Sequence, residues 1–170
     1  ATAYMDSTPM VAITANVPTA LIGSDSFQEA YITGITMPIT KHNYVVRRVE
    51  DLADTLRDAF RIANSGRKGP VLVDIPKDVT AAECEYSPKP PVVLTNGAKK
   101  PDPAALAEMA KVINTAVRPV VHFGGGVTTS GAADILREFL RKTKIPACHT
   151  IMGTGVLAHD EPLNMGMLGM

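Results

Sequence analysis

Short apolar runs alternate along this chain with longer stretches in which hydrophobic residues recur every three or four positions. A continuous apolar run is typical of a strand buried in a parallel sheet, and the longer period is typical of a helix with one apolar face. The pattern predicts strands at 9–14, 40–46, 71–76, 118–123 and 145–150, and helices at 26–35, 49–63, 103–116 and 130–140. This alternation predicts an α/β fold.

The clearest helical period runs from Val49 to Ala63, with apolar residues on one side and aspartates and arginines on the other. Glu50 and Asp51 fall in its first turn, where their charge suits the positive end of the helix dipole. A glycine-rich loop then leads into 71–76, which is apolar on both faces. We therefore expect this strand to lie inside a parallel sheet.

The composition changes after Asp78, where prolines and lysines replace the periodic pattern. We interpret 81–100 as an interdomain linker that its prolines keep extended. The linker separates a first domain at 1–80 from a second domain at 101–170.

The second domain begins with a helix for which Asp102 is the predicted N-cap and Pro103 lies in the first turn. A strand, a tight turn at Gly124–Gly126 and a helix from Ser130 follow. The predicted apolar stripes are Leu106, Met109, Ala110, Ile113 and Ala116 on the first helix, and Ile135, Leu136, Phe139 and Leu140, facing inward, on the second. This order of elements predicts the start of a Rossmann-like βαβ domain.

The charge balance and the cysteines exclude several classes of function. The 17 basic residues equal the 17 acidic ones and form no basic run, so nucleic-acid binding has no electrostatic support. The apolar runs have the length of strands and predict no transmembrane helix, and no signal-peptide pattern is present. Cys84 and Cys148 lack the spacing of a disulfide framework or a thiolate metal site. We expect a reducing, cytoplasmic setting.

The stretch Gly23–Glu29 combines a glycine hinge, short polar residues able to cap, and an aromatic beside an amide at the predicted start of helix 26–35. A helix N-terminus presents free N–H groups and suits a polar or anionic ligand. An ordinary N-cap explains the same residues. Spacing alone leaves both interpretations open.

Several cations are also ambiguous. Lys77 follows the interior strand 71–76 directly, so it is either a cation at the rim of the sheet or an active-site charge. Lys41 and His42 are likewise either rim residues or active-site charges, or they simply begin a strand. Arg67, between glycines, is either a solvated turn residue or an anion clamp.

The Gly124–Gly126 turn would let backbone approach a phosphate, as a dinucleotide site requires. Thr129 stands where the full fingerprint has its third glycine, so a plain βα turn is an equal alternative.

The cluster Met165–Met170 is either core filler or a flexible apolar wall against a flat ring. His122, His149 and His159 show no ligand spacing, and we predict no metal site. Without a catalytic triad, carboxylate pair or Cys-His arrangement, the chemistry must come from a bound cofactor or from other parts of the protein.

Five motifs occur in an order that matches one family. They are Gly-Ser-Asp-Ser-Phe-Gln-Glu at 23–29, Thr-Lys-His-Asn at 40–43, Gly-Pro-Val-Leu-Val-Asp-Ile-Pro-Lys-Asp at 69–78, Gly-Gly-Gly at 124–126 and Thr-Ile-Met-Gly-Thr-Gly at 150–155. Over essentially its whole length the chain resembles the large, catalytic subunit of acetolactate synthase (acetohydroxyacid synthase). The first three motifs together are specific, whereas the glycine turn alone is not.

The resemblance implies that 1–80 is the latter part of the pyrimidine-binding domain of a thiamine-diphosphate enzyme, and that 101–170 opens an FAD-binding middle domain. The family decarboxylates pyruvate on thiamine diphosphate and joins the product to pyruvate or 2-ketobutyrate, in branched-chain amino-acid biosynthesis. Its cofactors are thiamine diphosphate, Mg²⁺ and FAD, and its FAD does no net redox work. It also implies a homodimer or homotetramer with the thiamine site between subunits, and a small regulatory subunit as a further partner.

The same resemblance assigns residues to sites. Phe27 and Gln28 match the substrate pocket beside the cofactor, and Lys77 matches the lysine at its entrance. Pro18 and Ser26 match the lining of the access channel. The positions that match FAD contacts are Arg67, Gly124, Gly125, Gly126, Thr150, Ile151, Leu168, Gly169 and Met170.

The chain also departs from the family. Ala15-Asn16 stands where the family has Gly-Gln, and Ser26 is commonly alanine. The activating glutamate is expected upstream of Ala1 and the Gly-Asp-Gly motif for diphosphate and Mg²⁺ downstream of Met170, so we expect a piece of a longer protein that is inactive alone. The alternatives are a related thiamine enzyme, such as a pyruvate oxidase or glyoxylate carboligase, or a nucleotide-binding Rossmann module.

Overall fold

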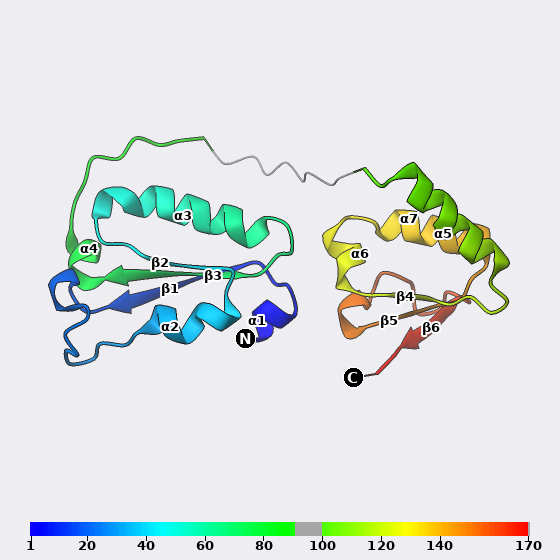
Figure 1. Cartoon of the computed structure of the whole chain (residues 1–170), viewed down its shortest axis with the longest axis horizontal. Coiled ribbons are helices and arrows are strands. Elements are labelled where there is room, and N and C mark those ends of the chain that lie inside the picture. The colour runs from blue at the N-terminus through cyan, green and yellow to red at the C-terminus, as the bar shows by residue number, and fades with distance from the viewer. Residues whose placement is uncertain (91–99, 170) are drawn as a thin grey trace. The chain divides into compact units, whose positions relative to one another are not determined.

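The computed structural model describes residues 1–90 and 100–169. The chain divides into two compact units, Ala1–Ala98 and Lys99–Met170, and each is built on its own three-stranded sheet (Figure 1). Every strand pair in both sheets is parallel. The α/β class predicted from the sequence is therefore confirmed.

In the first unit the sheet has the strand order β1 (Met10–Asn16), β3 (Pro70–Pro76), β2 (His42–Val45). All seven residues of β3 are buried, as its apolar sequence predicts for an interior strand. The register pairs Met10 of β1 with Pro70 of β3 and ends with Asn16 opposite Pro76. Residues after the carboxyl ends of β1 and β3 therefore meet at one edge of the sheet.

One face of this sheet is covered by α3 (Val49–Asn64), whose apolar stripe packs on the odd-numbered residues of β3 (Figure 1). The prediction is wrong for Phe60 of this stripe, which is 58% exposed. The buried core contains Val46, Ala59, Ala63, Val71, Val73, Ile75 and Val79. The short helix α2 (Ile32–Thr36) lies on the opposite side of the sheet (Figure 1). Because side chains alternate along a strand, the even-numbered residues of β3 face that second side.

The helix predicted at 26–35 is wrong. Residues Gly23 to Glu29 form turns, and the helix begins only at Ile32. Asp25 and Gln28 have positive φ angles of 59° and 66°, which a right-handed helix does not allow. The Glu29 carboxylate accepts hydrogen bonds from the backbone N–H groups of Gly23 and Ser26, and this local pairing replaces the helical one.

Shorter elements complete the first unit. They are α1 (Thr2–Met5), the 3₁₀ turns η1 (Thr19–Leu21) and η2 (Met37–Ile39), and α4 (Lys77–Ala81). The first of these, α1, is a single short turn of helix at the start of the chain. The helix α4 follows β3 without a connecting loop.

In the second unit the sheet has the order β4 (Val121–Phe123), β5 (Ala147–His149), β6 (Asn164–Met167). The helix α7 (Ala133–Thr143) packs on it through Leu136, Phe139 and Leu140. The other buried members of this core are Phe123, Ala147, Val156 and Leu157. The predicted βαβ unit is confirmed, and β6 extends it by a strand that the apolar pattern did not predict.

Two predictions about the helices after the glycines are wrong. Gly125 and Gly126 are the first residues of a short helix, α6 (Gly125–Thr129), and do not form a turn. Gly131, at φ 71°, ends that helix, so the next one begins at Ala133 and not at Ser130. Ile135 is 71% exposed because it lies roughly 100° around α7 from Leu136, at the margin of the apolar stripe.

The helix α5 (Pro103–Thr115) begins as predicted, because the Asp102 side chain accepts a 3.1 Å hydrogen bond from the N–H of Ala104. Most of its predicted apolar stripe is exposed, with Leu106 at 47% and Met109 at 59%, and Ile113 is half-buried. None of its residues is buried.

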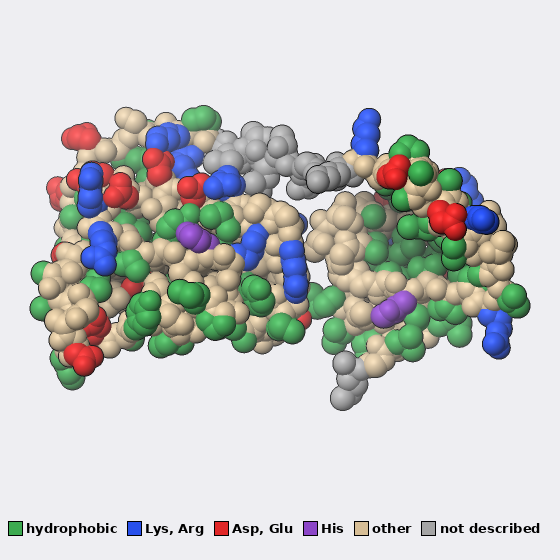
Figure 2. All heavy atoms as spheres, viewed as in Figure 1, with side chains coloured by type: hydrophobic (Ala, Val, Ile, Leu, Met, Phe, Trp, Pro, Cys, Tyr) green, Lys and Arg blue, Asp and Glu red, His purple; other side chains and the backbone are tan. Residues whose placement is uncertain are grey.

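Both units carry exposed apolar side chains between their charged ones. In Figure 2 hydrophobic side chains line the lower margin of the first unit in this view, and charged side chains concentrate over its upper part. Within 1–90 and 100–169, none of the helices combines the length and the apolar content needed to cross a membrane.

Candidate functional site

Two of the predicted site residues lie at the carboxyl edge of the first sheet. Pro18 follows β1 and is the N-cap of η1, and Lys77 follows β3 as the first residue of α4. The two turns are joined by Asp78, whose carboxylate accepts a 3.0 Å hydrogen bond from the N–H of Thr19 and a second one from its hydroxyl. Ligands of open α/β sheets bind outside the carboxyl ends of strands, so this edge is the first candidate site.

The bonds to Thr19 also act on the acidity of Asp78. The Thr19 hydroxyl and then its backbone N–H hold the pKa of the Asp78 carboxyl below its ordinary value, because both stabilise the charged form. Asp78 therefore remains a carboxylate at neutral pH. Lys77 beside it is exposed, at the same edge of the sheet as Pro18.

The loop with Phe27 and Gln28 continues from the same edge. The Ser24 hydroxyl donates a 2.6 Å hydrogen bond to the carbonyl oxygen of Leu21, which ties this loop to the end of η1. Phe27 is 89% exposed and Gln28 is exposed as well. Both side chains are thus available to a ligand.

Glu29 holds this loop in shape. Its carboxylate accepts from the N–H of Gly23, from the N–H of Ser26 at 3.0 Å and from the Ser26 hydroxyl at 3.2 Å. These donors, with Gly23 the strongest, lower the pKa of Glu29. Ser26, predicted in the channel lining, is therefore engaged at its backbone and its side chain.

Arg67 lies at the other end of the sheet, because it precedes β3 whereas Lys77 follows it. Its guanidinium donates to the Ser7 hydroxyl at 2.9 Å and to the carbonyl oxygens of Tyr4 and Met5 at the end of α1. This is the arrangement of a C-terminal helix cap. The structure does not bring Arg67 together with Lys77 or Pro18.

Lys41 also has a structural role. Its ammonium group donates to the carbonyl oxygens of Ile62 and Ser65 at the end of α3. Partial burial lowers its pKa by penalising the charged form. His42, beside it, is exposed and packs edge-to-face on Tyr44 with ring centroids 4.4 Å apart. Neither residue faces the carboxyl edge.

A second candidate site lies at the carboxyl edge of the second sheet. Gly124 follows β4, Thr150 follows β5, and Leu168 follows β6. The Thr150 N–H donates to the carbonyl oxygen of Phe123 at 2.9 Å, and the Leu168 N–H donates to that of His149 at 2.9 Å. Three strand ends thus converge here. Ile151 is 66% exposed and Gly169 follows at φ 69°, whereas Met170 lies outside the described residues.

The three glycines at this edge have different roles. A Cβ on Gly124 would lie 2.9 Å from Thr150 Oγ1, and one on Gly125 would lie 3.0 Å from Met152 Cβ. These two glycines let α6 pack closely on η3 (Ile151–Gly153). A Cβ on Gly126 would meet nothing within 4 Å, so the packing of this chain does not require a glycine there. The open space beside Gly126 leaves its backbone accessible to a ligand.

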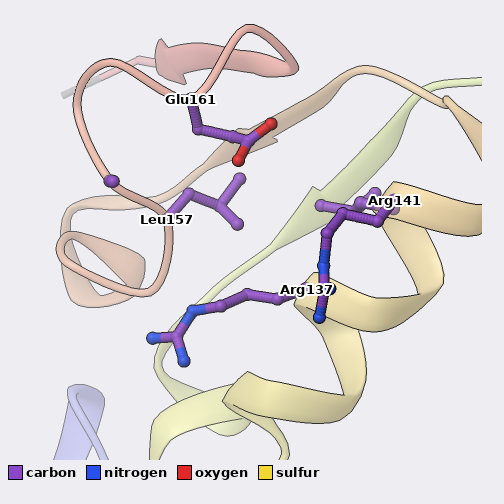
Figure 3. Close-up of a pocket in the computed structure, with 6 residues that line it drawn as sticks. Arg137, Arg141, Leu157 and Glu161 are labelled. Atoms are coloured by element: carbon purple, nitrogen blue, oxygen red, sulfur yellow. The ribbon is translucent and has the colours of Figure 1, made fainter.

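A hollow of about 200 Å³ lies between α7 and the segment that follows η3 (Figure 3). It is lined by Arg137, Leu140, Arg141, Leu157, Ala158 and Glu161. In Figure 3 the guanidinium of Arg137 extends away from Glu161. It donates at 2.8 Å to the carbonyl oxygen of Val156 and at 2.5 Å to Asp134. None of the residues predicted to form a site lines this hollow, and Arg137 ties α7 to the next segment.

Sequence reasoning missed Asp74 and the role of Asp78. Asp74 is fully buried, and its carboxylate accepts from Thr14 and Asn16 of β1. The available signal was a single carboxylate inside an otherwise apolar strand, which requires a partner. In the part of the chain that the structure describes, no group of three or more His, Cys, Asp or Glu residues is arranged to hold a metal ion.

Several known proteins are similar to this chain. Residues 106–170 match the family described as "Thiamine pyrophosphate enzyme, central domain". The whole chain is 45% identical to the Escherichia coli acetolactate synthase isozyme 1 large subunit and 49% identical to the acetolactate synthase of Mycobacterium bovis. It spans 30% and 28% of the length of these two relatives.

A solved structure of a thiamin diphosphate-dependent enzyme from Mycobacterium smegmatis is similar with a TM-score of 0.82 and 26% identity, over 99% of this chain and 32% of that one. The chain is therefore similar over its whole length to acetolactate synthase large subunits, and its residues 106–170 match the central domain of thiamine pyrophosphate enzymes.

Proposed function

We propose that the protein contributes to acetolactate synthase activity, the thiamine-diphosphate-dependent decarboxylation of pyruvate and its carboligation to a second 2-ketoacid. With pyruvate as acceptor the product is 2-acetolactate, and with 2-ketobutyrate it is 2-aceto-2-hydroxybutyrate. The observation that carries this proposal is identity of 45% and 49% to acetolactate synthases over the whole chain. Because the chain spans 30% or less of these relatives, the proposal gives it a share of the site and not all of it.

In this proposal the first unit provides a wall of the substrate pocket. Phe27 and Gln28 contact the substrate, the Lys77 ammonium attracts the 2-ketoacid carboxylate, and Pro18 and Ser26 line the channel. Support comes from the exposure of Phe27, Gln28 and Lys77 and from the position of Pro18 and Lys77 at the carboxyl edge of the sheet. Thiamine diphosphate, when bound, supplies the electron sink for decarboxylation.

The second unit is proposed to hold FAD. The contacts from this unit would come from Gly124, Gly125, Gly126, Thr150, Ile151, Leu168, Gly169 and Met170. The resemblance also assigns Arg67, a residue of the first unit, to FAD. The open space at Gly126 fits such a group, because a backbone without Cβ allows close approach. Arg67 has weaker support, since its guanidinium already caps α1. Mg²⁺ would accompany the diphosphate group of thiamine diphosphate.

The organisation proposed with this function has three parts. Residues 1–80 belong to a pyrimidine-binding domain, 81–100 to a linker, and 101–170 to the FAD-binding middle domain. The enzyme is a homodimer or homotetramer in the cytoplasm, with a small regulatory subunit as a further partner. Analytical ultracentrifugation of the assembled enzyme distinguishes the two oligomers.

A chimera tests the proposal. This chain replaces the aligned segment of the Escherichia coli isozyme 1 large subunit, with which it is 45% identical over 170 residues. We expect the chimera to form acetolactate from pyruvate only when thiamine diphosphate and Mg²⁺ are present, and the unmodified enzyme is the control. Product without thiamine diphosphate contradicts the proposal. Reduction of the flavin by pyruvate without acetolactate formation would favour a pyruvate oxidase.

A further inference from the structure

A buried carboxylate, that of Asp74, lies in the central strand of the first sheet. Asp74 is 0% exposed, and its two oxygens accept from the Thr14 hydroxyl at 2.7 Å and from Asn16 Nδ2 at 2.6 Å. The β1–β3 register places Thr14 directly opposite Asp74, and Asn16 lies two residues further along the same face. Burying a carboxylate is costly unless hydrogen bonds satisfy it, and here β1 supplies them.

The bond to Asp74 also decides how the Asn16 amide is oriented. A carboxylate only accepts hydrogen bonds, so the Nδ2 group of Asn16 must face Asp74. Asn16 Oδ1 then points away from Asp74 and accepts a 2.8 Å hydrogen bond from the N–H of Val17. The side chain is thus fixed at both ends, and it sets the direction in which the chain leaves β1 toward Pro18.

A second carboxylate holds the other end of the same loop. Asp78 accepts from the backbone N–H of Thr19 at 3.0 Å and from its hydroxyl. The loop Asn16–Thr19 is therefore attached at its start to Asp74 and at its end to Asp78. Lys77 lies between these two attachment points in the sequence.

We propose that Asp74 and Asp78 are positioning residues that clamp the loop Asn16–Thr19 beside Lys77 and so fix Pro18 relative to the Lys77 backbone. The clamp itself follows from the contacts of this chain. Its effect on catalysis rests on the proposed function, in which Pro18 lines the channel and Lys77 attracts the substrate. Neither aspartate touches the substrate in this proposal.

An exchange of the two polar side chains tests the clamp. In Asn16→Asp two carboxylates face each other, and the amide donor to Asp74 is lost while the Thr14 hydroxyl remains. In the double variant Asn16→Asp/Asp74→Asn the amide at position 74 donates to the carboxylate at position 16, whose second oxygen still accepts from Val17. The hydrogen bond between positions 16 and 74 is then restored with donor and acceptor exchanged. If Asp74 mattered only as a buried acidic residue, the double variant would not recover the slow exchange.

The measurement is amide hydrogen exchange by NMR on this chain at neutral pH. We expect Asn16→Asp to accelerate exchange of the Val17 amide at least about tenfold, and the double variant to return it to near the unmodified rate. Asp78→Ala should accelerate exchange at Thr19 in the same way, and Asp58→Ala on the exposed side of α3 is the control. If Asn16→Asp does not fold, the double variant and Asp78→Ala decide the test. Unchanged exchange at Val17 in Asn16→Asp, or no rescue in the double variant, overturns the clamp.

The kinetic constants of the chimera give a measurement that a purely structural role of Asp78 would not change. We expect Asp78→Ala to raise the KM for pyruvate several-fold with a smaller change in kcat, because the loop is displaced and no reacting group is lost. A chimera that makes no acetolactate would contradict the proposed function, whereas the exchange rates in this chain would still report the clamp. If Asp78→Ala accelerates exchange of the Thr19 amide but leaves the KM for pyruvate unchanged in the chimera, the link between the clamp and the channel is overturned.

Discussion

The Lys41 ammonium group donates a 2.6 Å hydrogen bond to the carbonyl oxygen of Ser65 and joins the start of β2 to the end of α3. It also donates to the carbonyl oxygen of Ile62 in the last turn of that helix. The last carbonyl groups of a helix lack partners within the helix, and a cation there also suits the helix dipole. Lys41 thus stabilises the main helix of the first unit.

Replacing Lys41 by methionine should lower the free energy of unfolding of the first unit by about 1.5–3 kcal/mol, the range for hydrogen bonds from a charged group. The measurement is urea denaturation followed by circular dichroism. Lys111→Met on the exposed side of α5 is the control and should change stability little. Equal stability of Lys41→Met and the unmodified chain would show that solvent satisfies these carbonyls equally well.

The loop Gly23–Glu29 should respond to acid. The pKa of Glu29 is lowered from its ordinary value of 4.5, mainly by the Gly23 N–H, so its carboxylate favours the folded loop above that value. This contribution falls as the pH falls through the lowered folded-state pKa. NMR titration should show the Gly23 and Ser26 amide signals moving with one pKa below 4.5. Glu29→Gln should remove that transition, and titration at or above the ordinary value would contradict the loop geometry.

The three glycines should tolerate alanine differently. Gly125→Ala should lower stability by about 1–3 kcal/mol, because its Cβ would meet Met152 Cβ at 3.0 Å. Gly124→Ala should cost less, since the Thr150 hydroxyl can rotate away, and Gly126→Ala should be neutral or stabilising by up to about 1 kcal/mol. Thermal denaturation of the three variants measures this order. A large loss of stability in Gly126→Ala would show that its side of α6 is not open.

Gly126→Ala also separates stability from binding. If FAD approaches this backbone, the variant should keep its fold in the chimera and lose flavin affinity, because the new methyl group occupies the space beside the helix. Flavin fluorescence titration measures the affinity. Unchanged flavin affinity in a folded chimera would remove Gly126 from the proposed FAD site.

The sequence was sufficient for the parts of the fold that depend on one strong local pattern. The continuous apolar run of β3, the period of α3 and the N-cap Asp102 each predicted the observed element. The loop Gly23–Glu29 was mispredicted as a helix start because the Glu29 carboxylate competes for its backbone N–H groups. Hydrogen bonds between one side chain and backbone groups three to six residues away leave no periodic pattern in the sequence.

Only part of the candidate site could be predicted from the sequence. Resemblance to a family assigned Pro18 and Lys77 to the site, which stays a prediction, and their position at one edge follows from the parallel sheet. Asp74 and Asp78 were not assigned roles, because their partners lie about 60 residues away, on β1 and at the start of η1, and the strand register decides which side chains meet. That register cannot be read from local pattern alone. The roles of Phe27, Gln28 and Lys77 in catalysis stay predictions.

The central claim is that this chain provides one wall of a thiamine-diphosphate pocket, and Lys77 tests it most directly. In the chimera we expect Lys77→Met to reduce kcat/KM for pyruvate at least about tenfold, equivalent to about 1.4 kcal/mol of transition-state stabilisation, while FAD absorbance stays unchanged. Gln28→Ala should behave similarly, and Lys68→Met is the matched control. Lys77→Met with kcat and KM equal to those of the Lys68→Met control would contradict the claim.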